Sequence, residues 1–431
     1  MIISKSSGLR GKIKVPGDKS ISHRSVMLGA LSEGTSHITG FLNGADCIST
    51  INCFRSMGVD IEYSGGSELT VHGTGLYGLK KPSDILDCGN SGTTTRILSG
   101  ILAGQSFSST LTGDASIQKR PMKRIIDPLK MMGSDIISIK DNGCAPLRIS
   151  PSKLHGIDYT MPVASAQVKS CLLMAALYAD GDTVIREPAL SRDHTEIMLE
   201  AMGAAISRSD SGVVLHPGNR LSSRDISVPG DISSAAYFLG AALLIPDSDI
   251  LIENVGINPT RDGIIHVLKK MGGNISLMDQ RSSAGEPVAD IHVKSSELSG
   301  TEISGDIIPA LIDELPLIAV AAAMAHGTTV IKDAGELRVK ESDRIALVTG
   351  NLKAMGADIE ATDDGFIING KDGDPRPLKG TRIDDANDHR IAMSFTVAGM
   401  AASGETTISH PECAAVSYPG FFEDISSLTD R

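Results

Sequence analysis

The alternation of apolar and polar residues predicts a chain built from short strands and small-residue-rich apolar helices. Apolar and polar residues alternate at Lys12–Val15 and again at Asp225–Val228, as is typical of strands. Each of these strands leads through a Val-Pro-Gly-Asp segment into an apolar helix. The two copies of the segment, residues 15–18 and 228–231, lie about half the chain apart. The pattern therefore predicts two structurally similar halves.

A shorter period divides each half into three units of roughly 72 residues. In each unit an apolar helix precedes a strand, which commonly reads Gly-x-Thr-x-Ile. A second helix then ends at Met-Gly before further strands. The first helices are expected to begin near Ser20, Ser91, Ser165, Ile232, Glu314 and His389. The Met-Gly pairs lie at residues 57–58, 132–133, 202–203, 271–272 and 355–356. We predict six units, each reading strand, helix, strand, helix, strand, strand.

The ends of the chain indicate how these units group into domains. The sixth unit runs to residues 421–431 without its own Met-Gly pair or following strand. Residues 1–15 belong to no complete unit, so we expect this N-terminal strand to complete the last sheet. One domain is then expected at residues 16–229, and the other at residues 230–431 together with strand 1–15. The chain would cross twice between domains, which predicts a ligand cleft with a hinge at the crossings.

Composition and charge exclude several classes of protein. With 41% hydrophobic and 21% charged residues, the chain has the profile of a soluble globular protein. No apolar run reaches the roughly 18 residues that span a bilayer, and the N-terminus resembles no targeting peptide, so we expect a cytoplasmic protein without a membrane partner. A net charge of -12, 3% aromatic residues and no Trp argue against nucleic-acid binding. The cysteines show no zinc-type spacing, and we expect no metal site.

Cations gather at the expected helix N-termini, where each opposes the helix dipole by roughly 0.3–1 kcal/mol. Capping explains the Ser, Asn and Asp residues there, but it does not explain Lys or Arg, and a bound anion would remove the conflict. The cations in question are Lys19, Arg24, Arg120, Arg192, Lys340, Arg344 and Arg390. Arg96 lies at a similar position. A four-residue spacing is expected to put Lys340 and Arg344 on one helical face, beside Glu341. The pattern predicts a site for phosphate or carboxylate ligands.

Eight segments, in order along almost the whole chain, resemble those of the 5-enolpyruvylshikimate-3-phosphate synthases. They are Gly17–Arg24, Gly89–Thr93, Lys119–Pro121, Ala164–Ser170, Arg192–Glu196, Asp313–Glu314, Arg338–Arg344 and Asp388–Ala392. The resemblance implies an α/β fold, a two-domain inverse α/β barrel with three βαβαββ repeats in each domain. It also implies an enzyme that transfers the enolpyruvyl group of phosphoenolpyruvate to the 5-hydroxyl of shikimate 3-phosphate and releases phosphate, on the pathway to chorismate and aromatic amino acids. No cofactor is implied, and we expect a monomer.

The resemblance assigns roles position by position. It implies contacts to shikimate 3-phosphate from Lys19, Ser20, Arg24, Ser165, Ala166, Gln167, Arg192, Asp313 and Lys340. It implies contacts to phosphoenolpyruvate from Lys19, Asn90, Gly92, Arg120, Gln167, Arg344 and Arg390. Asp313 resembles the base that accepts the hydroxyl proton, whereas Lys19 and Glu341 resemble the groups that move the proton at C3 of phosphoenolpyruvate. Gly92 at the phosphoenolpyruvate site predicts sensitivity to the inhibitor glyphosate.

The chain departs from the family pattern at two positions. Many members carry a Lys just before an aromatic-Pro pair near the C-terminus, but here the stretch reads Val416-Ser417-Tyr418-Pro419, so that contact is not carried over. Others have Ser-Ser-Gln where this chain has Ala166 in the middle position, which removes one hydroxyl from the shikimate 3-phosphate site.

Two alternative functions stay open at the level of sequence. Enolpyruvyl transferases that act on UDP-N-acetylglucosamine share the fold, but they usually begin with Lys-Asn and carry a catalytic-loop Cys. This chain has Lys19-Ser20 instead, and no Cys lies between Cys88 and Cys144. The other alternative is a non-catalytic binding protein for phosphorylated sugars. A carboxylate such as Asp313 among the cations argues against it, because a buried negative charge would weaken simple anion binding.

Overall fold

The computed structural model describes residues 1–209, 212–370 and 378–429, which form two compact units. Unit 1 consists of Met1–Pro16, Pro229–Ser282 and Pro287–Arg431. Unit 2 consists of Gly17–Val228 and Ser283–Glu286. The chain therefore passes from one unit to the other within each Val-Pro-Gly-Asp segment, and twice more around residues 283–286, which the sequence did not lead us to expect. The cleft and hinge expected at the crossings stay predictions.

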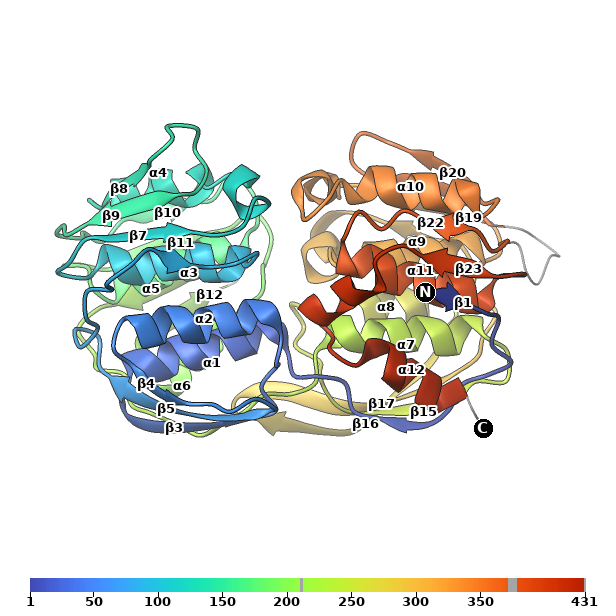
Figure 1. Ribbon diagram of the computed structural model, residues 1–431, viewed down its shortest axis with the longest axis horizontal. Coiled ribbons are helices and arrows are strands. Elements are labelled where there is room, and N and C mark those ends of the chain that lie inside the picture. The colour runs from blue at the N-terminus through green and yellow to red at the C-terminus, as the bar shows by residue number, and fades with distance from the viewer. Residues whose placement is uncertain (210–211, 371–377, 430–431) are drawn as a thin grey trace. The chain divides into compact units, whose positions relative to one another are not determined.

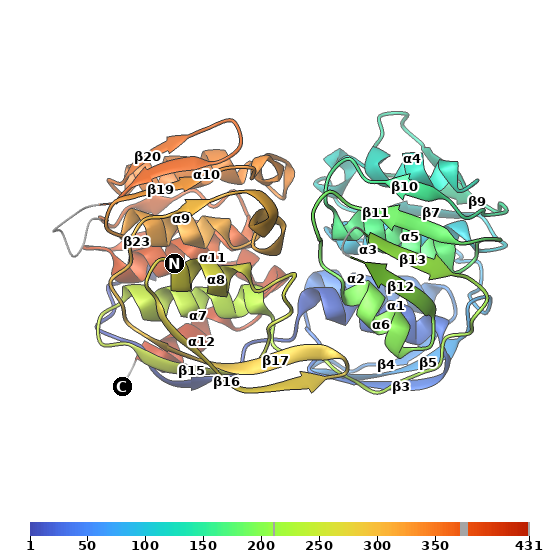
Figure 2. The same ribbon diagram turned by 180° about the vertical axis from the view of Figure 1, so that it is seen from behind.

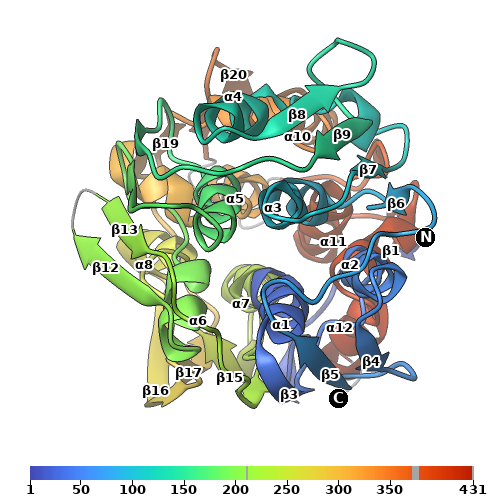
Figure 3. The ribbon, with the colours of Figure 1, turned by 90° about the vertical axis from the view of Figure 1, so that its left-hand side faces the viewer.

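Unit 2 contains three four-stranded sheets arranged around central helices (Figure 3). One sheet has the order β14 (Ile226–Ser227), β3 (Glu33–Thr39), β5 (Glu68–Thr74), β4 (Asp60–Glu62). The next has the order β6 (Leu86–Asp87), β7 (Ser109–Thr112), β9 (Leu147–Ser150), β8 (Asp135–Ser138). The last has the order β10 (Asp158–Thr160), β11 (Thr183–Arg186), β13 (Gly212–His216), β12 (Ala205–Ser209). In each sheet the first two strands are parallel and the others antiparallel.

The central helices of unit 2 are α1 (Lys19–Leu31), α3 (Gly92–Ala103) and α5 (Ala166–Ala176), and nearly all their residues are buried. Small residues allow this close packing, since a Cβ on Gly100 of α3 would lie 2.0 Å from the carbonyl oxygen of Cys171 on α5. The second helices are α2 (Ala45–Ser56), α4 (Lys123–Met131) and α6 (His194–Ala201). Each stops at a Met-Gly pair whose glycine has positive φ, the conformation that ends a helix at low cost.

Unit 1 repeats this arrangement with the central helices α7 (Ile232–Leu244), α9 (Leu315–Ala323) and α11 (His389–Ala401). One sheet has the order β2 (Arg10–Ile13), β15 (Asp249–Gly256), β17 (Glu286–Lys294), β16 (Asn274–Ser283). A second has the order β18 (Glu302–Ile303), β19 (Thr328–Ile331), β21 (Phe366–Asn369), β20 (Asp358–Ala361). The third has three strands, β22 (Arg382–Ile383), β23 (Thr406–Ile408) and β1 (Ile2–Ile3). The other helices are α8 (Gly263–Lys270), α10 (Arg344–Ala354) and α12 (Phe421–Thr429).

The N-terminal segment forms two strands rather than the single strand expected at residues 1–15. Strand β1 pairs antiparallel with β23 and takes the place of the missing strand of the last unit, as Figure 1 shows. Strand β2 instead pairs in parallel with β15, in the sheet that follows α7. Correspondingly, β14 precedes α7 in the chain but pairs with β3 after α1. The strand before each Val-Pro-Gly-Asp segment thus lies in one unit, and the helix after the segment lies in the other unit. As a result, β2 joins a sheet of unit 1 and β14 joins a sheet of unit 2.

Backbone contacts at the first crossing explain why its glycine is needed. A Cβ on Gly17 would lie 1.7 Å from the carbonyl oxygen of Gly40. Gly40 itself has a φ of 71°, and a Cβ there would lie 2.3 Å from the carbonyl oxygen of Val228. Three backbone segments of unit 2 meet at this point, and side chains would separate them.

Two further features complete the fold. The strands β16 and β17 form a long hairpin, drawn in yellow in Figure 2, whose tip is the segment Ser283–Glu286. Across the part of the chain that the structure describes, no helix combines the length and the apolar character that a membrane crossing requires.

Candidate active site

The residues singled out from the sequence fall into two clusters, one in each unit. The unit 2 cluster consists of Lys19, Ser20, Arg24, Asn90, Gly92, Arg120, Ser165, Ala166, Gln167 and Arg192. The unit 1 cluster consists of Asp313, Lys340, Glu341, Arg344 and Arg390. Each cluster is described separately below.

Most residues of the unit 2 cluster lie at or just before the first turns of the central helices, whereas Arg24 lies further into α1 and Arg120 and Arg192 lie in loops. Helix α1 begins at Lys19, and the side chain of Asp18 caps it by accepting a hydrogen bond from the Ile21 N–H at 2.8 Å. Helix α3 begins at Gly92 after the cap residue Ser91, whose hydroxyl oxygen accepts from the Thr94 N–H at 3.0 Å. Helix α5 begins directly after Ser165. Local capping signals therefore place the predicted residues at the positive ends of helix dipoles, where anions bind.

Arg24 is buried and held on three sides. Its Nε donates to Thr195 Oγ1 at 2.6 Å, its Nη2 to Ser170 Oγ at 2.8 Å, and its Nη1 to the carbonyl oxygen of Ser20 at 2.9 Å. Burial lowers the pKa of Arg24 to about 10, while the negative charge of Glu196 acts in the opposite direction. The guanidinium therefore stays protonated at neutral pH with its orientation determined.

Two guanidinium groups converge at the start of α3. Arg120 Nη2 donates to Asn90 Oδ1 at 2.9 Å, and Arg96 Nη1 donates to Gln167 Oε1 at 2.5 Å. A Cβ on Gly92 would lie 2.7 Å from Arg96 Nη1 and 3.3 Å from Arg120 Nη1. Gly92 therefore lets both cations approach the helix N-terminus, and the combined positive charge favours an anion there. Sequence analysis noted the position of Arg96 but assigned it no role. Its positive charge near the expected start of a helix was the available signal, although the structure places Arg96 just beyond the first turn of α3.

Lys19 forms an ion pair in this structure. Its Nζ lies 2.5 Å from Asp46 Oδ2, and both side chains are mostly buried. The carboxylate favours the protonated form of the lysine. Asp46 was not recognised from the sequence, because an Asp in the first turn of α2 also fits ordinary stabilisation of a helix dipole.

In unit 1, the carboxylate of Asp313 lies among three cations. Lys340 Nζ is 3.6 Å from Asp313 Oδ1, Arg344 Nη1 is 3.4 Å from the same oxygen, and Arg390 Nη2 is 3.7 Å from Oδ2. Lys340 and Arg344 belong to the segment Arg338–Arg344, and Arg390 belongs to the segment Asp388–Ala392. The structure therefore places three of the other four unit 1 residues around the carboxylate of Asp313.

The fifth residue, Glu341, contacts the same cluster through Arg344. Glu341 Oε2 accepts from Arg344 Nη2 at 2.7 Å, and Asp388 Oδ2 accepts from Arg344 Nε at 2.8 Å. Burial acts to lower the pKa of Arg344, but the carboxylates of Asp388 and Glu341 raise it above the ordinary arginine value. Asp388 was not singled out as a site residue, because an Asp before a helix reads first as a cap.

The expectation that Lys340 and Arg344 share a helical face is wrong. The short 3-10 helix η3 (Gly335–Val339) ends before Lys340, and α10 begins only at Arg344. Asp343 causes this break, because its side chain accepts a hydrogen bond from the Ala346 N–H at 3.0 Å and so caps α10 at this point. The two cations meet at Asp313 through the loop between the helices, not through helical periodicity.

Arg390 lies in the first turn of α11 between two acids. Its Nη1 is 3.7 Å from Glu314 Oε1, in addition to its contact with Asp313. Burial acts to lower the pKa of Arg390, but the charge of Asp313 contributes to raising it well above the usual value. Glu314 is buried and also accepts a hydrogen bond from the Ser233 hydroxyl on α7. This buried acid was part of a sequence motif but received no role of its own.

Comparison with known proteins identifies the family of the chain that carries these clusters. The model of the EPSP synthase family, 3-phosphoshikimate 1-carboxyvinyltransferase, matches residues 3–425. The chain belongs to the EPSP synthase family. It is 53% identical over 429 residues to the 3-phosphoshikimate 1-carboxyvinyltransferase of Geobacter sp. (strain M21), covering 100% of this chain and 99% of that protein. It is 54% identical over 424 residues to that of Bacillus cereus (strain 03BB102), covering 98% of each.

A solved structure of EPSP synthase from Acinetobacter baumannii agrees with the fold. Its TM-score is 0.89 at 48% sequence identity, and the match covers 99% of this chain and 97% of that chain. The resemblance inferred from the sequence and the predicted two-domain α/β fold are both confirmed.

Val416 stands where many family members carry a lysine. It is the last residue of the 3-10 helix η4 (Pro411–Val416). The next two residues, Ser417 and Tyr418, are buried, and Tyr418 donates its hydroxyl to Asp424 Oδ2 at 2.8 Å. This departure from the EPSP synthase pattern therefore lies directly before two buried residues.

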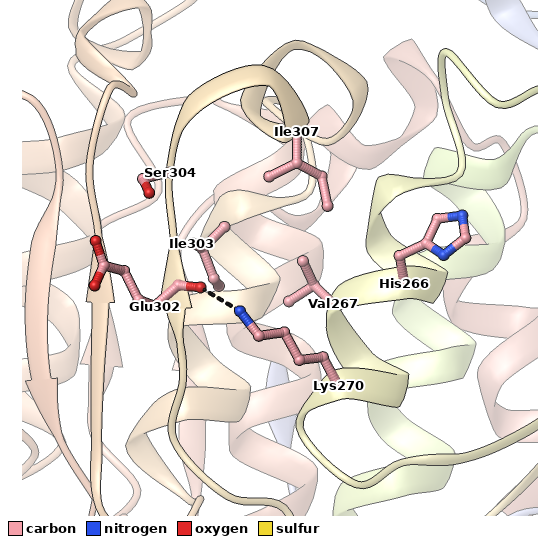
Figure 4. Close-up of a pocket in the computed structure, with 7 residues that line it drawn as sticks. All are labelled: His266, Val267, Lys270, Glu302, Ile303, Ser304 and Ile307. Carbon is pink, nitrogen blue, oxygen red and sulfur yellow. Dashed lines mark hydrogen bonds between the residues drawn. The ribbon is translucent and has the colours of Figure 1, made fainter.

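A surface pocket of about 350 Å³ in unit 1 is separate from both clusters. Figure 4 shows its lining residues His266, Val267, Lys270, Glu302, Ile303, Ser304 and Ile307. Lys270 Nζ donates to the carbonyl oxygen of Glu302 at 2.9 Å, and the Glu302 carboxylate pairs with Lys332 at 2.9 Å. These charged groups already have partners within the protein. The pocket also shares no residue with the positions expected to bind substrates in an EPSP synthase.

Proposed function

We propose that this chain catalyses transfer of the enolpyruvyl group of phosphoenolpyruvate to the 5-hydroxyl of shikimate 3-phosphate, with release of phosphate, in the shikimate pathway to chorismate and aromatic amino acids. Membership of the EPSP synthase family and the names of its relatives support this function. The observation that carries it is the position of Asp313 among Lys340, Arg344 and Arg390. A simple anion-binding protein gains nothing from an acid at that point, whereas a transferase needs a base next to its anionic substrates.

The charges of the two clusters fit the proposed substrates. Two phosphates and two carboxylates together carry about -5 to -6 at neutral pH, since the second phosphate pKa is near 6. The proposed contacts to shikimate 3-phosphate are Lys19, Ser20, Arg24, Ser165, Ala166, Gln167, Arg192, Asp313 and Lys340. The proposed contacts to phosphoenolpyruvate are Lys19, Asn90, Gly92, Arg120, Gln167, Arg344 and Arg390. Arg96 joins the second set through its approach to Gly92.

The reaction proceeds by addition and then elimination. In the addition, the 5-hydroxyl oxygen bonds to C2 of phosphoenolpyruvate, Asp313 accepts the hydroxyl proton, and C3 gains a proton. In the elimination, C3 loses a proton, the bond between C2 and the phosphate oxygen breaks, and the double bond re-forms. Lys19 and Glu341 are the proposed groups for the proton at C3. The ion pair with Asp46 holds the ammonium of Lys19 in position. No step uses a metal or an organic cofactor.

A coupled assay of phosphate release tests the function directly. The purified chain is supplied with phosphoenolpyruvate and either shikimate 3-phosphate or UDP-N-acetylglucosamine. We expect one phosphate per enolpyruvyl group transferred, and only with shikimate 3-phosphate. Turnover with the nucleotide sugar alone would assign the chain to the alternative transferase, and binding without turnover would leave it as a binding protein. We also propose a cytoplasmic monomer, and light scattering measures its mass in solution.

A further inference from the structure

The tip of the β16–β17 hairpin carries a buried acid that has no role in the reaction described above. The hairpin strands belong to unit 1, but the tip, Ser283–Glu286, belongs to unit 2. A glutamate at a hairpin tip is ordinarily exposed, yet Glu286 is only 3% exposed. The neighbouring Gly285 packs closely on α6, because a Cβ there would lie 3.1 Å from Ile197 Cγ2. The tip is therefore part of the structure around the start of α6.

Glu286 makes a direct hydrogen bond to the first residue of α6. The Nδ1–H of His194 donates to Glu286 Oε1 at 2.7 Å, and the two side chains are 2% and 4% exposed. Among the described residues, Nε2 of His194 has no hydrogen-bond partner. The orientation of this buried ring consequently rests on the single hydrogen bond to the hairpin tip.

The residues that follow His194 connect α6 to the anion-binding arginines. Thr195 Oγ1 accepts from Arg24 Nε at 2.6 Å. Glu196 Oε1 lies 2.8 Å from Lys169 Nζ of α5. Arg192 lies two residues before His194, next to the cap residue Asp193. Three successive buried side chains thus attach the first turn of α6 to three different elements, and the hairpin tip is one of them.

We propose that Glu286 is a positioning residue for Arg24 and Arg192, acting through His194 and the first turn of α6. This role rests on the proposed function, in which both arginines bind shikimate 3-phosphate. With the carboxylate in place, the His194 ring is held and α6 begins at a defined point. Without it, His194 is left buried and unpaired, and the turn that holds Thr195 against Arg24 loses one of its three attachments.

Electrostatics support the same assignment. Burial and the positive charge of Arg192 act to lower the pKa of Arg24, whereas the carboxylates of Glu196 and Glu286 act to raise it, and the pKa comes to about 10. Glu286 therefore places a negative charge near Arg24 without joining its hydrogen bonds, which go to Thr195, Ser170 and Ser20.

The test compares Glu286→Ala with Glu286→Gln in the full chain. Steady-state kinetics give kcat and both KM values, calorimetry gives the Kd of shikimate 3-phosphate, and thermal unfolding gives Tm. We expect Glu286→Ala to raise the Kd and KM of shikimate 3-phosphate about fivefold to tenfold, the effect of one lost buried hydrogen bond, with the KM of phosphoenolpyruvate unchanged. Glu286→Gln keeps an oxygen acceptor for His194 and is expected to restore most of the affinity. If Glu286→Ala does not fold, Glu286→Asp replaces it.

The matched control is Asp279→Asn on the same hairpin. Asp279 is exposed and has a φ of 46°, which Asn tolerates, so this variant is expected to behave as wild type. A lower Tm with unchanged shikimate 3-phosphate affinity would show a purely structural role and overturn the proposal. So would tighter binding in Glu286→Ala, or a Gln variant as weak as the Ala variant. Wild-type turnover is measured first: its absence refutes the proposed function itself, whereas an active wild type with an unaffected Glu286→Ala variant refutes only the role of Glu286.

Discussion

Asp388 holds the guanidinium of Arg344 and at the same time caps the helix that carries Arg390. Its Oδ2 accepts from Arg344 Nε at 2.8 Å, and its Oδ1 accepts from the backbone N–H of Arg390 at 3.0 Å. The Asp388 and Arg344 side chains are 0% and 1% exposed. One buried carboxylate therefore sets the positions of two cations that approach Asp313.

Replacing this carboxylate by its neutral isostere is expected to destabilise the protein. Asp388→Asn can still accept the capping hydrogen bond, but it leaves Arg344 buried with less compensating charge. We expect a loss of about 3 kcal/mol in the free energy of unfolding, as for other broken buried ion pairs, together with a higher KM for phosphoenolpyruvate. Urea unfolding measures the first effect, with the exposed Asp306→Asn as control. A wild-type unfolding curve for Asp388→Asn would contradict this account.

The proposed base gives a second prediction. Asp313→Asn should reduce kcat by about 10²–10⁴-fold, the usual contribution of a general base. Binding of the anionic substrates should persist or tighten, because the substitution removes a negative charge from among three cations. Steady-state kinetics together with calorimetric titration separate the two effects. Turnover near the wild-type value would remove Asp313 from the mechanism.

Gly92 gives a prediction about inhibition. We expect the wild type to be inhibited by glyphosate, and Gly92→Ala to weaken glyphosate more than phosphoenolpyruvate, because the added methyl clashes first with the longer ligand. The structure adds a second cost, since the new Cβ would lie 2.7 Å from Arg96 Nη1 and would displace that guanidinium. The inhibition constant and the KM for phosphoenolpyruvate are measured for both forms. An equal shift in both values, or a wild type that is already tolerant, would show that the steric argument fails.

His23 gives a prediction about pH. This histidine is fully buried with Nδ1 next to Thr50 Oγ1 at 2.7 Å, and burial lowers its pKa from 6.5 to about 3. Because the unfolded chain binds the proton more readily, the stability from neutral His23 is complete above pH 6.5 and is lost as the pH falls toward 3. The slope should approach about 1.4 kcal/mol per pH unit within this window.

Urea unfolding of wild type and His23→Gln across this pH range isolates the effect from that of titrating carboxylates. The difference in unfolding free energy between the two proteins should shrink as the pH falls. The exposed His37→Gln serves as the control for the substitution itself. A pH-independent difference for His23→Gln would mean that His23 does not resist protonation in the folded protein.

Much of the local structure follows from signals within a few residues. The central helices begin within one residue of the positions expected from the sequence, at Lys19, Gly92, Ala166, Ile232, Leu315 and His389. The Met-Gly pairs end the second helices, because a glycine with positive φ closes a helix wherever it occurs. Each motif that resembled the family also spans only a few residues. The family assignment that these motifs suggested is confirmed. The roles of the individual site residues stay proposals.

The sequence by itself determined the repeat, the starts of the helices and the gathering of cations near those starts, because apolar periodicity, capping and helix dipoles act over one or two turns. Only the tertiary structure decided that residues 1–15 divide between two sheets, that Asp388 joins Arg344, and that Glu286 reaches His194. Asp388 and Arg344 are separated by 44 residues in the sequence, and Glu286 and His194 by 92 residues. Pairings over such distances depend on which strands and helices pack together, and no local pattern of residues carries that information.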